Sequence, residues 1–388
     1  RRCRARILAM MRSSSFSASM FRSLLASAGL FVVCCSQAFA GPQNSAPVRV
    51  AIVGLEHGHV AGFLNAFPKQ QDAELVGIVD ADTALCDKYQ KQYHLDPTMF
   101  YATLDDLLAH QHPQALLVYT AVGEHRRVIE AGAAHGLDAM VEKPLTLSLD
   151  DALAIRRAAD EHHVHVLVNY ETTWYASNRA VYDMIQQGRL GEVRRVVIHD
   201  GHQGPIEIHV QPEFLKWLTD PAENGAGALY DFGCYGADLM TWLMHGEIPL
   251  SVTAVSQMDK PQEYPRVDDD ATIILRYPKT QAVLMPSWNW TFNRKDMEVY
   301  GTKAYVIAVN PTEVRQRFSE SAPEEKVTEP PLAAPEDTSL HYLAAVVRGQ
   351  IQPHGDLSAL DTNVTVMRIL DAARESARTG KTVELKSE

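Results

Sequence analysis

Short apolar segments alternate with helical segments between residues 48 and 170, and this alternation limits the fold more than any other feature of the chain. Strand-like apolar segments occur at 48–54, 73–80, 115–120, 139–141 and 164–170. The intervening residues predict helices at 58–67, 82–93, 124–135 and 148–163. Apolar strands that are connected through helices form a parallel sheet with helices on both faces. The sequence therefore predicts a doubly wound α/β domain of the Rossmann type, which we place at residues 41–170.

The pattern changes after residue 170, where strands begin to alternate apolar and polar residues. After a helix at 178–187, such strands occur at 192–199, 271–277, 282–290 and 297–309, with hairpin turns at 278–280 and 301–303. We expect a surface loop at 319–335, helices at 340–348 and 360–377, a helix end at Gly380 and an edge strand at 382–385. Residues 171–388 therefore predict an α+β domain with a largely antiparallel, open sheet.

The first forty residues have the pattern of an export signal. Residues 1–22 contain six arginines and no acidic residue, and an apolar segment at 24–35 precedes Ser-Gln-Ala-Phe-Ala at 36–40. A basic segment, an apolar segment and a small-x-small site in this order predict cleavage after Ala40. The apolar segment is shorter than the roughly 20 residues that span a bilayer. We therefore expect a periplasmic or extracellular protein without a membrane anchor after cleavage.

Charge limits the partners of the remaining chain. Residues 41–388 carry 48 acidic and 30 basic side chains, which gives a formal net charge of −18. Binding to nucleic acid or to an anionic membrane requires a basic surface. We therefore expect a small-molecule ligand and no nucleic-acid partner.

The turn after the first strand indicates a dinucleotide site. It reads Gly-Leu-Glu-His-Gly-His at 54–59, where only Gly54 matches Gly-x-Gly-x-x-Gly, and Glu56 and His59 occupy the other two positions. Asp80 ends the second strand, where a carboxylate accepts the ribose hydroxyls of NAD and repels the 2′-phosphate of NADP. We therefore predict NAD rather than NADP. The alternative is a different ligand at the same sheet edge, with Asp80 starting a turn.

Two further motifs carry candidate catalytic groups. Glu142-Lys143-Pro144 follows a strand, and a lysine there can bind a substrate hydroxyl and pass a proton, although such a pair is more often a surface ion pair. Asp231 and Tyr235 are four residues apart, so a helix would place them on one face with Asp231 at its start. The alternative is a helix cap at Asp231 and a packing role for Tyr235.

In this order the motifs resemble the Gfo/Idh/MocA oxidoreductase family, whose members include glucose–fructose oxidoreductase and inositol dehydrogenase. The resemblance includes Gly54, Asp80, the Glu-Lys-Pro motif, the pattern Gly-x-Gly-x-Leu-x-Asp-x-Gly-x-Tyr-x-x-Asp at 225–238, and residues 376–384. It covers essentially the whole chain after residue 40. It implies a nicotinamide cofactor, a sugar-like substrate and a homo-oligomer formed through the C-terminal sheet.

The resemblance also assigns roles to individual residues. It implies that Lys143 touches the reacting hydroxyl and that Asp231 orients the substrate. Tyr235 stands where most members have a catalytic histidine, and glucose–fructose oxidoreductase is similar to this chain in having tyrosine there. A phenol, with an ordinary pKa of about 10, exchanges protons at neutral pH only beside a cation such as Lys143. The base therefore stays open between Tyr235 and Lys143. The predicted cofactor residues are Gly54, Leu55, Glu56, His57, Gly58, His59, Asp80, Thr120, Ala121, His125, Glu142 and Lys143.

A polar cluster peculiar to this chain follows the strand at 192–199. It contains His199, His202, Glu207 and His209, which could contact a sugar, bind a divalent ion or lie in a solvated loop. Their spacing matches no particular metal geometry, so we predict substrate contact through His202 and no metal site. Trp174 is a candidate stacking platform for a sugar ring, with core packing as the alternative. Asp231 and Tyr235 complete the predicted substrate residues.

Three functions follow from these predictions. The first is an exported NAD(P)-dependent oxidoreductase that transfers hydride at a hydroxyl of a sugar or glycoside. Free NAD is scarce outside the cytoplasm, which favours an enzyme that keeps its cofactor. The second is therefore a redox-neutral NAD-dependent glycosidase with a tightly bound cofactor. The third is a non-catalytic sugar-binding or sensing protein, because a fold does not determine a function.

Overall fold

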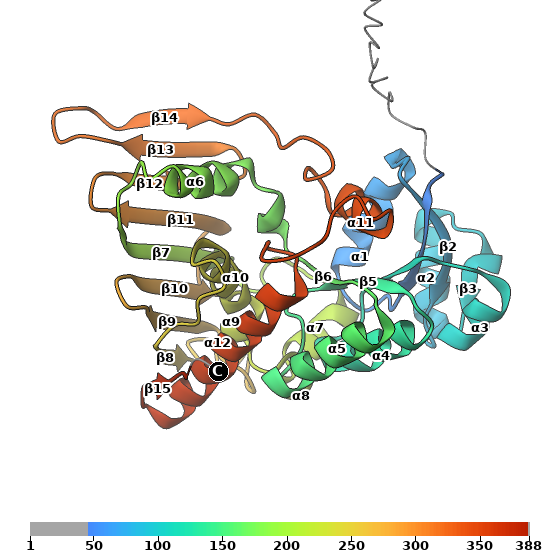
Figure 1. Cartoon of the computed structure of the whole chain (residues 1–388). Helices are drawn as coiled ribbons and strands as arrows, with labels where there is room; N and C mark the ends of the chain where they lie inside the picture. Colours follow the sequence, from blue (N-terminus) through green and yellow to red (C-terminus); the bar gives the residue numbers. More distant parts are fainter. Residues whose placement is uncertain (1–45, 387–388) are drawn as a thin grey trace, which may run out of the picture. The chain divides into compact units, whose positions relative to one another are not determined.

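The computed structural model describes residues 46–386 (Figure 1). The first sheet of the chain consists of parallel strands. The strands are β1 (Val48–Val53), β2 (Ala73–Val79), β3 (Phe100–Tyr101), β4 (Ala115–Val118), β5 (Asp138–Glu142) and β6 (Val166–Asn169). Their order is β3-β2-β1-β4-β5-β6. Successive strands are therefore added on one side of β1 and then, from β4 onward, on the other side. The boundary between β1 and β4 is the position at which doubly wound sheets bind ligands. The predicted export signal lies outside the described residues.

Helices cover both faces of this sheet. They are α1 (His59–Ala66), α2 (Thr83–Tyr93), α3 (Leu104–His110), α4 (His125–Ala134), α5 (Leu149–His162) and α11 (Ser339–Val347). Val50 and Ile52 of β1 belong to a core with α1, α2 and α11, whereas Ala51 and Val53 belong to a core with α4 and α5. Each fully buried aliphatic side chain of this size contributes about 1.5–3 kcal/mol. The predicted two-faced parallel sheet is confirmed.

The second sheet has nine strands in the order β14-β13-β12-β11-β7-β10-β9-β8-β15. Its strands are β7 (Val193–Gly201), β8 (Ser251–Gln257), β9 (Asp270–Arg276), β10 (Gln281–Ser287), β11 (Arg294–Gly301), β12 (Tyr305–Ala308), β13 (Glu313–Arg317), β14 (Glu325–Thr328) and β15 (Val383–Glu384). β7 and β10 pair in parallel, and the other neighbours pair antiparallel. The predicted α+β domain with a largely antiparallel sheet is confirmed.

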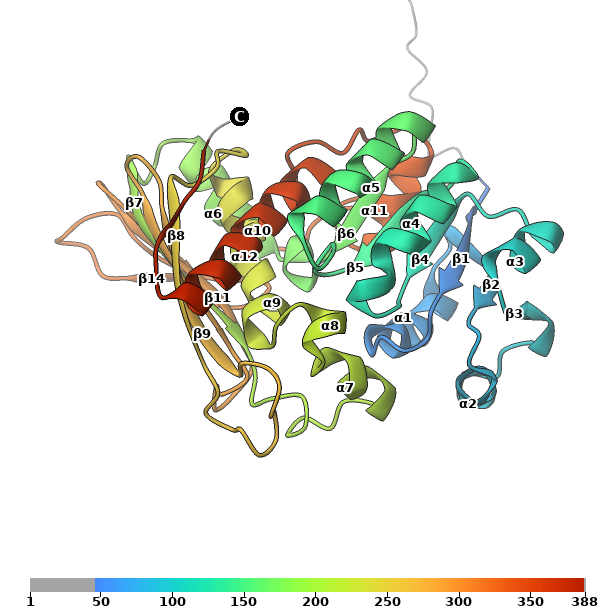
Figure 2. The same cartoon turned by 90° about the horizontal axis from the view of Figure 1, so that it is seen from below.

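One long helix joins the two sheets. The remaining helices are α6 (Ala176–Gln186), α7 (Pro212–Leu218), α8 (Pro221–Asn224), α9 (Ala228–Asp231), α10 (Gly233–Leu243) and α12 (Leu360–Thr379). Short 3₁₀ helices are η1 (Phe67–Lys69), η2 (Pro97–Met99), η3 (Val122–Glu124) and η4 (Glu171–Trp174). α12 contacts β8, α10 and α5, so it lies between the two parts of the chain (Figure 2). It ends at Gly380, as predicted, with φ at 66°.

Helix α11 returns from the C-terminal part of the chain to the first sheet. Leu340 and Leu343 of α11 pack in the core that includes α1. The residue boundaries of the two domains therefore stay a prediction. Within residues 46–386, no helix combines the length and the hydrophobicity that crossing a membrane would require.

The second half of the chain corrects two predictions. The expected surface loop at 319–335 contains β14, because this segment pairs with β13 at the edge of the sheet. Asp231 does not start a helix that includes Tyr235, because it is the last residue of α9 and α10 begins at Gly233. The carboxylate of Asp268 determines where α9 begins, since it accepts the N–H groups of Gly227 and Leu229. Asp231 and Tyr235 therefore lie on two successive helices.

Candidate active site

A cavity of about 600 Å³ lies at the carboxyl ends of β1, β2 and β4. Predicted cofactor residues in its wall are Gly54, Glu56, Asp80 and Thr120. This is the edge at which the strand order reverses. The volume falls in the range of about 300–1,000 Å³ that is usual for small-molecule sites. Four of the twelve predicted cofactor residues therefore line this cavity, and the other eight do not.

Backbone geometry explains why Gly54 and Asp80 stand at this cavity. Gly54 has φ at +88°, and a β-carbon there would lie 2.6 Å from Cγ2 of Thr120 and 2.8 Å from its nitrogen. Asp80 Oδ2 accepts the N–H of Leu55 at 2.8 Å, and its Oδ1 accepts the N–H of Asp82 at 2.8 Å. These bonds hold the Asp80 carboxylate beside the turn after β1. A glycine and a carboxylate at these places fit a dinucleotide with its ribose at Asp80.

We expect Gly54→Ala to destabilise the protein by about 2–3 kcal/mol, because alanine disfavours a positive φ and its methyl group would overlap Tyr119 and Thr120, just after β4. Gly62→Ala is the matched control, since Gly62 lies within α1 with no neighbouring atom within 4 Å. Alanine there is expected to stabilise α1 by up to about 1 kcal/mol. Urea unfolding of the two variants measures both values. A Gly54→Ala variant as stable as the wild type would contradict the steric argument.

Glu56 is the main departure from a glycine-rich turn. Its Oε1 accepts the N–H of Ala121 at 2.8 Å, so the side chain points to the end of β4. Burial raises the pKa of Glu56, and the neighbouring carboxylates of Asp80, Glu223 and Glu124 add to this effect. Glu56 therefore places a carboxyl group where a dinucleotide would lie. The hydroxyl of Thr120, buried beside this cavity, has no hydrogen-bond partner within residues 46–386.

Two histidines that we predicted to bind the cofactor are buried among protein groups. His57 is buried, with its ring centroid 4.7 Å from that of Phe214 and 5.2 Å from that of Trp217. His125 is also buried, and its ring nitrogens lie 3.2 and 3.3 Å from the carbonyl oxygens of Leu145 and Thr120. Burial lowers the pKa of His57 well below its ordinary value and that of His125 to about 4. Neither residue belongs to the wall of the cofactor cavity.

A second cavity, of about 200 Å³, contains the predicted catalytic groups. Its polar wall residues are Lys143, Asp231, Tyr235, His202, His59, Gln211 and Lys295. Nζ of Lys143 lies 2.5 Å from Oδ1 of Asp231 and 3.1 Å from its carbonyl oxygen. The structure therefore brings together a lysine and an aspartate that are 88 residues apart in the sequence.

Lys143 and Asp231 form a buried ion pair. Their side chains are 5% and 6% exposed. Burial acts to lower the pKa of Lys143, but the carboxylate of Asp231 outweighs this effect and raises it. Burial likewise acts to raise the pKa of Asp231, but Lys143 and the indole N–H of Trp288 hold it below its ordinary value. The ammonium and the carboxylate therefore stabilise each other's charge.

Trp288 and Lys295 belong to this site but were not predicted. Nε1 of Trp288, at the end of β10, donates to Oδ2 of Asp231 at 2.9 Å. Lys295 of β11 has its Nζ 5.0 Å from the ring centroid of Tyr235 and forms an ion pair with Glu171. No local motif marks either residue, because each reaches the site only through the pairing of its strand in the second sheet. The one local feature that could have pointed to this part of the site is the pair of tryptophans at 288 and 290.

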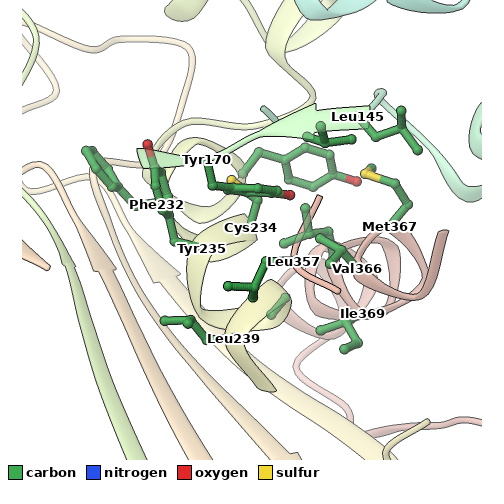
Figure 3. Close-up of a cluster of buried hydrophobic side chains, with 14 of the residues drawn as sticks. Leu145, Tyr170, Phe232, Cys234, Tyr235, Leu239, Leu357, Val366, Met367 and Ile369 are labelled. Atoms are coloured by element: carbon green, nitrogen blue, oxygen red, sulfur yellow. The ribbon is translucent and has the colours of Figure 1, made fainter. Parts of the chain in front are cut away.

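Tyr235 presents its ring rather than its hydroxyl to the ammonium. Nζ of Lys143 lies 5.3 Å from its ring centroid. The ring packs against Tyr170 and Phe232, with centroid distances of 5.4 and 5.8 Å, within a buried hydrophobic cluster (Figure 3). Burial raises the pKa of Tyr235 well above its ordinary value. The phenol therefore stays neutral at neutral pH, and Lys143 is the charged group of the two.

The polar cluster after β7 does not form one site. His202 lines the cavity of Lys143, and its Nδ1 accepts the N–H of Gly204 at 2.9 Å, which leaves Nε2 as a donor. Burial lowers the pKa of His202 to about 4. His199 lies within β7 rather than after it, and its Nδ1 is 2.9 Å from Oδ2 of Asp296. Glu207 contacts Lys260 at 2.6 Å. Only His202 of these residues reaches the catalytic cavity described above.

Trp174 lies in the wall of a third cavity instead. This cavity, of about 440 Å³, also includes His59, Glu142 and Asn169. The indole N–H of Trp174 donates to Oδ1 of Asn169 at 3.2 Å, and its ring centroid is 5.7 Å from that of Tyr342. Lys143 is not part of this wall. The second and third cavities share Gly58 and His59. Trp174 therefore lies in a cavity next to the catalytic one and does not line the catalytic cavity itself.

Comparison with known proteins finds relatives of this chain. The chain is similar to inositol 2-dehydrogenase from Rhizobium meliloti (strain 1021), with 26% identity over 79% of this chain and 89% of that protein. It is also similar to trans-1,2-dihydrobenzene-1,2-diol dehydrogenase from Xenopus tropicalis, with 24% identity over 55% of this chain and 60% of that protein. The alignment thus spans less than two thirds of the latter protein.

A solved structure shows the same fold. The aldose-aldose oxidoreductase from Caulobacter crescentus, complexed with glycerol, has a TM-score of 0.75 and 23% identity over 87% of this chain and 100% of that chain.

Family models match both parts of the chain. Residues 48–170 match an oxidoreductase family with an NAD-binding Rossmann fold. Residues 178–307 match the GFO/IDH/MocA C-terminal domain. These matches confirm the family predicted from the order of the motifs. The chain therefore belongs to the Gfo/Idh/MocA family of NAD-binding oxidoreductases.

Proposed function

We propose that the protein is an exported NAD-dependent oxidoreductase that transfers hydride at a hydroxyl-bearing carbon of a sugar or glycoside. The observation that carries this proposal is the buried Lys143–Asp231 ion pair in a cavity close to the dinucleotide turn. The names of the relatives support the substrate class, because inositol is a polyol and the aldose-aldose oxidoreductase is complexed with glycerol. The chemistry of the site agrees with ligands that carry several hydroxyl groups.

The side chains of the catalytic cavity act on the substrate oxygen. The ammonium of Lys143 binds the reacting oxygen and stabilises the negative charge that develops on it. Asp231, which Trp288 holds through its indole N–H, keeps this ammonium in place. Nε2 of His202 offers a further neutral donor in the same cavity. Gly54, Asp80 and Thr120 would hold the cofactor, and the nicotinamide supplies the hydride chemistry when bound.

The carboxylates of the cofactor cavity favour NAD over NADP. Asp80 and Glu56 both line this cavity, and a 2′-phosphate would bring further negative charge beside them. We expect NADP to bind at least about tenfold more weakly than NAD, which corresponds to ~1.4 kcal/mol. Isothermal titration with each dinucleotide measures this ratio. Equal affinities would remove this part of the proposal.

Export and assembly complete the proposal. The pattern of residues 1–40 supports export, and N-terminal sequencing of the secreted protein should begin at Gly41. A chain that stays uncleaved in the cytoplasm would contradict export.

We also propose a homo-oligomer that forms through the second sheet, on which Val255 of β8 is an exposed apolar residue. Light scattering of the purified protein measures its mass in solution. A monomer in solution would contradict the proposed homo-oligomer.

One experiment tests the function directly. Mass spectrometry of the denatured protein should detect a released nicotinamide dinucleotide, and a screen of sugars and polyols should then change the absorbance of the reduced nicotinamide. Absence of any bound or titratable dinucleotide would overturn the proposal. Release of an aglycone from aryl glycosides without an added acceptor would identify a redox-neutral glycosidase instead. Sugar binding without turnover would identify a sensor.

A further inference from the structure

The catalytic pair is buried, yet the proposed reaction must exchange a proton with water in every turnover. When an alcohol is oxidised to a carbonyl, the C–H hydrogen leaves with its electron pair to the nicotinamide, and the O–H hydrogen leaves as a proton. Lys143 and Asp231, with side chains 5% and 6% exposed, have little direct contact with water. A further group that faces both this cavity and the solvent is therefore required.

Several titratable residues of the cavity wall do not meet this requirement. Tyr235 is 1% exposed, and burial raises its pKa well above its ordinary value. Burial lowers the pKa of His202 to about 4, and its Nδ1 already accepts a backbone N–H. Lys295 is 11% exposed and forms an ion pair with Glu171. Each of these groups would have to leave its stable protonation state before it could pass a proton.

His59 meets the requirement. It is the first residue of α1, it belongs to the walls of both the catalytic cavity and the neighbouring one, and its side chain is 46% exposed. Imidazole is the side chain that gains and loses a proton most readily near neutral pH. His59 thus connects the cavity of Lys143 with solvent.

Glu142 orients the ring of His59. Oε2 of Glu142 lies 2.8 Å from Nδ1 of His59, and its Oε1 accepts the side-chain N–H of Asn169 at 3.0 Å. Burial acts to raise the pKa of Glu142, but His59, Asn169 and Lys143 together hold it below its ordinary value. Glu142 is therefore an ionised acceptor, so Nδ1 of His59 carries a proton. Nε2 of His59 is then left free to accept and release a second proton.

We propose that His59, oriented by Glu142, carries the reaction's proton between the Lys143–Asp231 pair and water. In the oxidative direction the ammonium of Lys143 gives one of its protons to Nε2 of His59 as it takes up the hydroxyl proton of the substrate, and His59 then releases its proton to solvent; in the reverse direction the same transfers run backwards. The charged and titratable groups near His59 include His57 of the same turn, Glu142 of β5 and Glu171 of η4, and Lys143 and Lys295 line the same cavity. The inference rests on the proposed function.

Substitution of His59 tests the inference on the full-length protein. We expect His59→Gln to lower kcat by about 10²-fold, the usual contribution of one proton-transfer group, and to change the NAD dissociation constant by less than about threefold. In His59→Ala, added imidazole should restore at least about a tenth of the lost rate. The solvent deuterium isotope effect on kcat should increase in His59→Gln. His162→Gln, at an exposed position at the end of α5, should leave every value unchanged.

A readout that does not depend on turnover tests the role of Glu142. In ¹⁵N NMR spectra of the wild type, His59 should carry a proton on Nδ1, the tautomer that donates to Glu142. Glu142→Gln should reduce the population of this tautomer, because the amide no longer requires a donor from the ring. It should also lower kcat by about tenfold. An unchanged tautomer in Glu142→Gln would overturn the role of Glu142.

The outcomes separate the inference from the proposed function. No turnover in the wild type would remove both. Wild-type turnover that His59→Gln leaves unchanged, with the same isotope effect, would remove the inference alone. A loss in His59→Ala that imidazole does not restore, with a parallel loss of NAD affinity, would show that His59 only supports the cofactor turn. Imidazole rescue with retained NAD affinity would support the proton-carrying role.

Discussion

Lys143→Met is expected to lower kcat by at least about 10³-fold while NAD still binds with nearly wild-type affinity. The variant keeps an unbranched side chain of similar length and loses the ammonium that contacts Asp231 at 2.5 Å. Loss of a proton-exchanging group costs about 10²–10⁴-fold, and loss of the charge that stabilises a developing oxyanion has a similar size. Steady-state kinetics with the sugar found in the screen measure kcat. Isothermal titration measures the affinity for NAD.

A surface lysine provides the control for this experiment. Lys279 is 69% exposed and pairs with Glu192, so Lys279→Met should retain wild-type kcat. If Lys143→Met kept more than about a tenth of the wild-type rate, Lys143 would not be the group that acts on the substrate oxygen. A loss of NAD affinity equal to the loss of kcat would instead indicate a role in cofactor binding. The comparison therefore separates chemistry from binding.

Asp231→Asn is expected to destabilise the protein by about 3–5 kcal/mol at neutral pH, the usual cost of removing one partner from a buried ion pair. The ammonium of Lys143 would remain buried beside a neutral amide and the ring of Phe232, 5.6 Å from its centroid. The double variant Lys143→Met/Asp231→Asn should regain about 2 kcal/mol of this loss, because no unpaired charge remains. Urea unfolding of the three variants and the wild type measures these differences.

The exposed pair of Lys279 and Glu192 is again the control. Glu192→Gln should leave the free energy of unfolding nearly unchanged, since water screens an exposed ion pair. A loss below about 1 kcal/mol in Asp231→Asn would show that the buried pair contributes little to stability. A double variant no more stable than Asp231→Asn would show that the asparagine, and not the unpaired ammonium, causes the loss.

The pH dependence of this stabilisation has a definite sign. Because the pKa of Asp231 is held below its ordinary value, its contribution is present above the pKa of the unfolded carboxyl group and is lost as the pH falls through the folded pKa. Because the pKa of Lys143 is raised, its contribution is present below the pKa of the unfolded amine and is lost as the pH rises through the folded pKa. The difference in unfolding free energy between the wild type and Asp231→Asn should therefore be smaller at about pH 3 than at about pH 7.

Parts of the fold follow directly from local sequence patterns. Apolar strands between helices predict the parallel sheet, and the register of β1 with β2 and β4 confirms it. Gly380 ends α12 because a residue with φ at 66° favours glycine. The break between α9 and α10 could not be predicted in this way. It depends on Asp268, a residue about forty positions later in the chain, whose carboxylate caps the start of α9.

The sequence by itself determined the two sheets and the family, because strand patterns and motif order can be read from a single chain. The approach of Lys143 to Asp231, 88 residues apart, was expected only from the family resemblance and is seen in the structure. Only the tertiary structure decided what surrounds that pair. Trp288 reaches Asp231 through the packing of β10, and burial keeps the phenol of Tyr235 neutral. The bond between His59 and Glu142 joins the start of α1 to the end of β5. Burial, charge and long-range contacts arise only when distant segments pack together, and no local pattern encodes them.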